Sequence, residues 1–216
     1  MTTTTSFPRR AWLAGLAATV LAGGCAMMAP RVETYTPPPL GSTWTSTRVN
    51  TGSYGTGTAQ VVTRRGERAW QGKPAITFEA QDGTIVANPA DANWYAIVAP
   101  NGQPVFSWDP PVGPVFPMEV GKTWVARTRI TNHMANVTVP VEATWKVEAY
   151  EDVTVPAGTF RTFRVAYVDN MGNSEVYWMS PELHMLFVKA VMTRTAAHRL
   201  GPGTREQQLV SQSIRK

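Results

Sequence analysis

Strict alternation of apolar and polar residues between Val137 and Ala149 is the clearest pattern in this sequence. Successive side chains of a strand point to opposite faces, so this pattern predicts a strand with one face in a core and the other in water. Pro140 lacks an N–H group, which predicts a sheet edge or a bulge at that position. The apolar positions are Val137, Val139, Val141, Ala143, Trp145, Val147 and Ala149.

The chain from Trp44 onward consists of similar short segments separated by turn residues. In the segment from Thr123 to Thr131, Trp124 and Ile130 are expected to face inward and Arg127 outward. Segments rich in Val, Thr and aromatic residues favour strands, and helical periodicity is absent from them. The turn signals are Gly52 to Gly57, Arg65-Gly66, Asp82-Gly83, Asn101-Gly102, Pro156-Ala157-Gly158, Met171-Gly172-Asn173 and Gly201-Pro202-Gly203.

These segments predict an all-β domain built from a curved antiparallel sheet, a half-barrel or a β-sandwich-like meander. Leu40-Gly41-Ser42-Thr43-Trp44 recurs as Val120-Gly121-Lys122-Thr123-Trp124. The repeat indicates either two related halves, 41–118 and 119–216, or simply a favourable way to start a strand. The last segment, Arg205 to Ile214, is interpreted as a strand, with a short helix as the alternative.

The first 24 residues form an export signal. Arg9-Arg10 precede an apolar run from Ala11 to Leu21, which is too short to cross a bilayer as a helix. The segment Ala22-Gly23-Gly24-Cys25 resembles the lipobox of bacterial lipoproteins. This resemblance implies cleavage after Gly24 and acylation of Cys25, with palmitate among the chains.

In enterobacterial lipoproteins, which this signal resembles, Ala rather than Asp at position 26 favours the outer membrane, so the resemblance implies an outer-membrane location with the domain facing the periplasm. The alternative is an ordinary secretory signal that leaves Cys25 as a free thiol. Residues 25–40 contain Pro30 and the run Pro37–Pro39. They predict an extended tether that precedes a domain spanning 41–216.

A second resemblance concerns the stretch from Gly121 to Val191. It contains a Val-Pro-Ala-Gly-x-Phe corner at Val155–Phe160, a later Tyr177-Trp178 pair and a Ser180-Pro181 turn. These motifs resemble exported bacterial β-rich domains of unknown function, whose shape is similar to the half-barrels of lipoprotein carriers. The resemblance implies a fold and an envelope setting, and it carries no catalytic residues.

Composition and motifs narrow the chemistry. Without the signal, 18 basic and 15 acidic residues remain, scattered too evenly to predict nucleic-acid binding. His133, His184 and His198 lack a second ligand at metal-binding spacing, and no nucleophile motif is present. We therefore expect no metal, no cofactor and no catalytic residue, although two carboxylates that meet only in space would escape this reasoning.

Four aromatic residues are the remaining candidates: Trp94, Tyr95, Phe106 and Trp108. They form either a surface for an acyl chain, a sugar or a partner protein, or the filling of a helix-poor core. The sequence thus predicts a non-enzymatic envelope lipoprotein that binds a lipid, another apolar ligand or an envelope protein. The alternative is an envelope hydrolase. An apolar cavity would favour the first, and a cleft with two carboxylates or a His–Asp pair the second.

Overall fold

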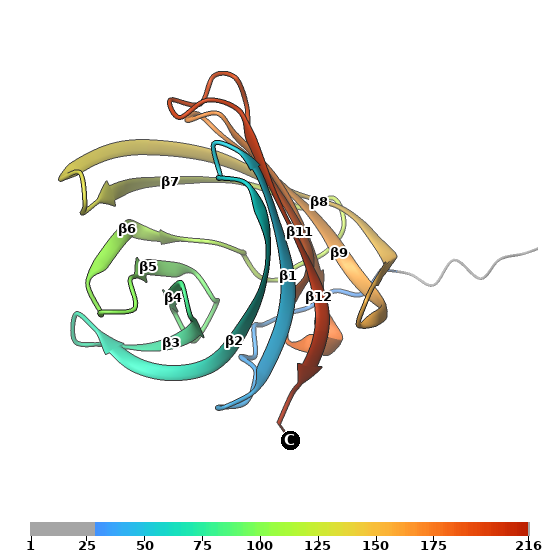
Figure 1. The fold of residues 1–216 in the computed structure, drawn as a ribbon. Helices are drawn as coiled ribbons and strands as arrows, with labels where there is room; N and C mark the ends of the chain where they lie inside the picture. The colour runs from blue at the N-terminus through green and yellow to red at the C-terminus, as the bar shows by residue number, and fades with distance from the viewer. Residues whose placement is uncertain (1–28, 216) are drawn as a thin grey trace, which may run out of the picture.

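The computed structural model describes residues 29–215, which form a closed antiparallel β-barrel. Each strand pairs with its neighbours in the chain, and β1 pairs with β12 to close the sheet (Figure 1). The all-β prediction is confirmed, and closure removes the exposed edges that an open half-barrel would have. The elements are β1 (Thr43–Gly52), β2 (Gly57–Trp70), β3 (Lys73–Ala80), β4 (Gly83–Ala87), β5 (Trp94–Val98), β6 (Pro104–Val112), β7 (Thr123–Asn132), β8 (Val137–Val155), β9 (Gly158–Asp169), β10 (Asn173–Ser180), the 3-10 helix η1 (Pro181–Leu183), β11 (Leu186–Arg194) and β12 (Gly203–Ser213).

The alternating segment is the first part of β8. Its apolar positions Val141 and Val147 are buried, whereas Glu142 between them is exposed. Pro140 pairs with β7, but pairing with β9 begins only at Ala143. The proline therefore sits where one side of β8 is unpaired, as its missing N–H group predicts.

Local turn chemistry also gives the expected connections. Asn101 and Gly102 lie between β5 and β6, and Pro156-Ala157 is the two-residue turn between β8 and β9. The C-terminal segment is strand β12, paired with both β11 and β1. Shifts of register at Thr45/Ser46, Val86/Ala87 and Trp178/Met179 bend the strands so that the sheet can close.

The turn predicted at Arg65-Gly66 is wrong, because β2 runs through both residues. Gly66 serves close packing instead of a change of direction. A Cβ atom there would lie 2.1 Å from Glu79 Oε1 and 2.5 Å from Thr77 Oγ1. Only glycine lets β3 place these two side chains over β2.

The main core lies between β8, β9, β10 and β11 and is built around Phe163 and Tyr177. The segment from Val32 to Leu40, here called the N-terminal strap, packs against it. Val32 and Met118 exchange two backbone hydrogen bonds of 2.9 and 2.8 Å, and Tyr35 is 8% exposed. This part of the expected tether is therefore attached to the barrel, because its apolar residues find partners there.

The strap contacts two loops, the β6–β7 loop and the β10–β11 loop, and each of these follows an even-numbered strand. In an antiparallel meander, the connections that follow odd-numbered strands lie at the other end. Figure 1 shows the β9–β10 and β11–β12 loops at the top and the C terminus at the bottom. The expected boundary between halves falls in the β6–β7 connection, with six strands on either side.

The expected signal peptide, residues 1–24, and Cys25 lie outside the described residues. Within residues 29–215, no helix has the length and apolar character to span a bilayer.

Candidate functional site

The barrel holds a partly open cavity of about 590 Å³, a size typical of small-molecule sites. The lining residues are Tyr54, Trp94, Ile97, Phe106, Trp108, Val112, Gly113, Pro114, Ile130, Asn132, Val137, Val139, Trp145, Tyr167, Asp169, Asn170, Met171, Asn173, Glu175, Tyr177, Met179, Phe187, Arg194, Ala197, His198, Arg199 and Leu200.

One wall of the cavity is apolar. The rings of Trp94 and Trp108 meet edge to face at 5.7 Å, and Ile130 lies in the same wall. Val137 and Val139 belong to the inward face of β8, yet they are 41% and 37% exposed. These side chains face an accessible space, so the wall can contact an apolar molecule.

Three of the four aromatic residues singled out from the sequence line this cavity, namely Trp94, Phe106 and Trp108. Tyr95 does not line it, because its side chain packs against the separate cluster of Ala75, Val86, Ala96 and Val98. The candidate surface is thus the inside of the barrel for three residues, and Tyr95 belongs to a separate packing cluster.

The opposite wall is polar and is centred on Glu175. Its side chain shares a face of β10 with that of Tyr177, whose hydroxyl donates a hydrogen bond to the Glu175 carboxylate. Burial raises the pKa of Glu175 to about 7, and the nearby Asp169 charge adds to this effect. Burial and the same carboxylate raise the pKa of Tyr177 well above its ordinary value.

Aromatic rings surround this carboxyl group. Trp145 stacks on Tyr177 at 5.9 Å and meets Tyr167 edge to face at 4.7 Å. Register explains the grouping, because Trp145 pairs with Tyr167 and Tyr167 pairs with Glu175. Adjacent strands thereby place these side chains side by side on the interior face.

Asp169 is a turn residue whose oxygens are fully engaged. Oδ1 accepts hydrogen bonds of 2.9 Å from the backbone N–H groups of Met171 and Asn173. Oδ2 accepts bonds from the Tyr167 hydroxyl at 2.7 Å and from Asn173 Nδ2 at 2.8 Å. These four bonds fix the β9–β10 turn and leave Asp169 little capacity for a ligand.

Two arginines flank Tyr54 at the loop end of the cavity. The guanidinium carbon of Arg194 lies 3.9 Å from the ring centre, and that of Arg205 lies 4.9 Å away. Arg194 Nη1 donates to the Ser53 carbonyl at 2.8 Å. Burial raises the pKa of Tyr54, whereas burial and the charge of Arg48 lower the pKa of Arg205.

His198 lies at the rim, where its Nδ1 accepts a hydrogen bond of 3.2 Å from the Leu200 N–H. Desolvation and the Arg194 charge lower its pKa, which favours the neutral ring. Residues 29–215 contain no group of three His, Cys, Asp or Glu side chains that could hold a metal ion.

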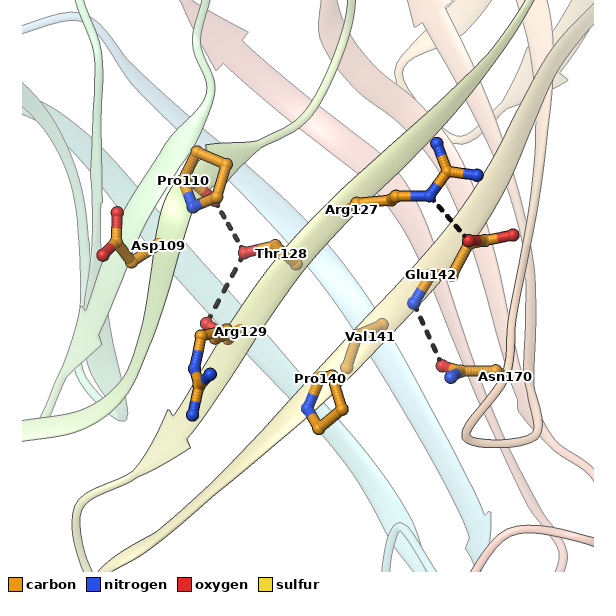
Figure 2. A pocket seen from close by; sticks show the side chains of 9 residues that line it. All are labelled: Asp109, Pro110, Arg127, Thr128, Arg129, Pro140, Val141, Glu142 and Asn170. Atoms are coloured by element: carbon orange, nitrogen blue, oxygen red, sulfur yellow. Dashed lines mark hydrogen bonds and ion pairs between the residues drawn. The ribbon is translucent and has the colours of Figure 1, made fainter.

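A second hollow, on the outside of the barrel, spans β6, β7 and β8 (Figure 2). Two of its charged groups pair with each other, since Arg127 Nε donates to Glu142 at 2.8 Å. Thr128 donates to the Pro110 carbonyl at 2.6 Å, and the Glu142 N–H donates to the side chain of Asn170 at 3.2 Å. These contacts join neighbouring strands of the sheet.

Glu175 and Tyr54 were not among the site residues predicted from the sequence. Glu175 alternates with Tyr177 and Met179 on one face of a strand, and a carboxyl at an inward position is the signal that was available. Tyr54 lies in the glycine-rich turn after β1 and was expected only to form a loop. Its contact with Arg194 depends on the end of β11, far along the chain.

No protein-family model matches this chain, and neither does any curated protein. Three solved structures have a similar course of the chain. One is a Bacteroides fragilis NCTC 9343 protein described as exported with a YmcC-like fold. It has 15% sequence identity and a TM-score of 0.46, and the match covers 84% of this chain and 99% of that one. The hypothetical lipoprotein YmcC from Escherichia coli K12 follows at 9% identity and 0.42, with 81% and 86% covered. A protein from Parabacteroides distasonis ATCC 8503, named as a lipoprotein, has 12% identity and 0.41, with 85% and 100% covered. Similarity at this level assigns no function to the chain.

Proposed function

We propose that this protein is a lipid-anchored envelope protein whose barrel binds an apolar or amphiphilic molecule. The observation that carries the binding function is the cavity of about 590 Å³, with an apolar wall on one side and a few polar groups on the other. Each CH₂ group moved from water to such a wall contributes about 0.8 kcal/mol. Trp94, Trp108 and Ile130 offer that contact without any rearrangement of the core.

The anchor rests on the sequence at Cys25. Cys25→Ser would abolish acylation, because the side-chain sulfur is the atom that carries the diacylglycerol. We expect wild-type protein made in its host to incorporate labelled palmitate and to sediment with membranes. The serine variant is expected to do neither, and labelling of the variant would contradict the assignment of Cys25.

Binding is tested with the neutral fluorescent probe N-phenyl-1-naphthylamine and the soluble chain 26–216. Its emission should rise on addition of the protein, with saturation at one site. Val139→Trp fills the cavity and should weaken binding at least tenfold. Val168→Trp is the matched control, because Val168 is exposed on the outer face of β9.

The absence of a fluorescence rise with wild-type protein would overturn the binding function. Equal loss in both variants would show that the probe binds elsewhere. Native mass spectrometry of protein purified from its host should show a co-purified lipid. A clean protein mass over several preparations would oppose a role as lipid carrier.

The alternative function, an envelope hydrolase, is favoured by one observation. Glu175 is a carboxyl with a pKa near 7 in a cavity, as a general acid requires. A second catalytic carboxylate would have to be Asp169, whose oxygens already accept four hydrogen bonds. Hydrolysis of p-nitrophenyl butyrate by wild-type protein, abolished in Glu175→Gln, would support this alternative.

A further inference from the structure

The arginines beside Tyr54 carry positive charge that the described chain does not neutralise by direct contact. The ion pairs within residues 29–215 all involve cationic side chains other than Arg194 and Arg205. Neither of these two arginines has a carboxylate oxygen within 4.0 Å. Arg48 lies close enough to Arg205 to lower its pKa, and Arg48 pairs with Asp82. The loop end of the cavity thus has an excess of cations.

Arg194 keeps unused hydrogen-bonding capacity. Its guanidinium carbon lies over the Tyr54 ring, and a guanidinium offers five N–H donors. One of the five N–H groups donates to the Ser53 carbonyl, and Nε is buried without an acceptor in the described chain. Nη2 donates no hydrogen bond within the described chain, and Arg194 lines the cavity, so this group can donate to a ligand there.

The two carboxyl groups of the polar wall do not offset these cations fully. Asp169 is held within the β9–β10 turn by its own four hydrogen bonds. Glu175 receives a hydrogen bond from Tyr177, and its raised pKa leaves it protonated in part of the molecules at neutral pH. A protonated Glu175 can donate a hydrogen bond to an anion rather than repel it.

We propose that the cavity selects an anionic amphiphile. Its oxyanion head, a carboxylate or a phosphate, accepts hydrogen bonds from Arg194 beside Tyr54, and its alkyl tail lies along Trp94, Trp108 and Ile130. This inference rests on the binding function proposed above. The head lies near the rim, because Arg194 is the last residue of β11 and Tyr54 is in the β1–β2 turn.

The experiment measures displacement of N-phenyl-1-naphthylamine by four amphiphiles, each built on a saturated chain of twelve carbons. These are dodecanoate, dodecyl phosphate, dodecanol and dodecyltrimethylammonium. With wild-type protein, the two anions should bind at least tenfold more tightly than the alcohol, and the cation most weakly. Inorganic phosphate and acetate at millimolar concentration should displace nothing, which separates an amphiphile site from a site for free anions.

The test variant is Arg194→Gln, which removes the charge and keeps a polar side chain. It should reduce the preference for dodecanoate over dodecanol at least fivefold. Arg161→Gln is the matched control, because Arg161 also stacks on a tyrosine, Tyr150 at 4.7 Å, but does not line the cavity. The control should leave the preference unchanged.

Three outcomes would overturn the inference while the binding function stands. They are equal binding of dodecanol and dodecanoate, tighter binding of the ammonium compound, or an unchanged preference in Arg194→Gln. The relative affinities of dodecanoate and dodecyl phosphate identify which oxyanion the head is. Failure of wild-type protein to bind N-phenyl-1-naphthylamine at all would instead overturn the binding function itself.

Discussion

Glu175→Gln should change how the stability of the barrel depends on pH. In the folded protein, burial raises the pKa of this carboxyl from 4.5 to about 7. The unfolded chain therefore releases the proton near pH 4.5, whereas the folded chain keeps it until about pH 7. Between these values the folded state binds more protons, so the free energy of unfolding falls as pH rises.

The size of the effect follows from the two pKa values. A rise from 4.5 to about 7 corresponds to at most about 3 kcal/mol, at 1.36 kcal/mol per pH unit. Water in the open part of the cavity screens the carboxylate, so we expect about 1 to 3 kcal/mol. Glutamine has a similar volume but cannot ionise. The unfolding free energy of the variant therefore lacks the pH dependence that Glu175 gives to the wild-type protein.

The assay is urea unfolding of the wild-type and variant chains 26–216 from pH 4.5 to pH 8. The unfolding free energy of wild-type protein minus that of Glu175→Gln should decrease across this range and level off above pH 7. A difference that stays constant or increases with pH would refute the reasoning.

Glu206→Gln is the control for this measurement. The hydrogen bond that Gln208 Nε2 donates at 2.7 Å lowers the pKa of Glu206. The stability that Glu206 contributes is present above its ordinary pKa and is lost as pH falls through the lowered value. Its wild-type minus variant difference should therefore stay level from pH 5 to pH 8.

Other substitutions test the packing of the barrel. Phe163→Ala, at a fully buried position in the main core, should reduce the unfolding free energy by about 3 to 5 kcal/mol, whereas Val168→Ala on the outer face should change it by less than about 0.5 kcal/mol. Tyr35→Ala should cost about 2 to 4 kcal/mol in urea unfolding, and it should speed tryptic cleavage after Arg31, next to the N-terminal strap; an unchanged cleavage rate would mean that the strap is held elsewhere. Gly52→Ala should destabilise the protein more than Gly102→Ala, as measured by thermal unfolding. Both glycines have positive φ, but only a Cβ atom at position 52 would lie 2.4 Å from a backbone oxygen of the β11–β12 loop. Equal losses of stability in the two variants would contradict this reasoning.

The strands were predictable because their signals are local. Alternation in β8, the Asn101-Gly102 turn and the Pro156-Ala157 turn all act within a few residues. Closure of the barrel depends instead on β1 pairing with β12, more than 150 residues later in the chain. Nothing in either strand alone distinguishes that pairing from an open sheet.

The strap and the cavity show why the rest was not predictable. Three consecutive prolines at 37–39 are typical of a spacer, and the contacts of Val32 and Tyr35 with the barrel decide otherwise. The aromatic candidates were identified as rings, but the sequence does not show whether a ring fills a core or borders an empty space. Glu175 and Arg194 become neighbours of one cavity only when β10 and β11 are placed in the closed sheet.

Attachment of the strap to the barrel also sets how a lipidated molecule would be oriented. Seven residue steps separate Cys25 from Val32, and seven steps can reach about 25 Å at most. The strap lies at the end of the barrel opposite the β9–β10 and β11–β12 loops (Figure 1). In a protein acylated at Cys25, the strap end of the barrel would thus face the bilayer. The β9–β10 and β11–β12 loops, whose residues line the cavity, would then point away from the bilayer, and a ligand of the proposed site would enter from the aqueous compartment.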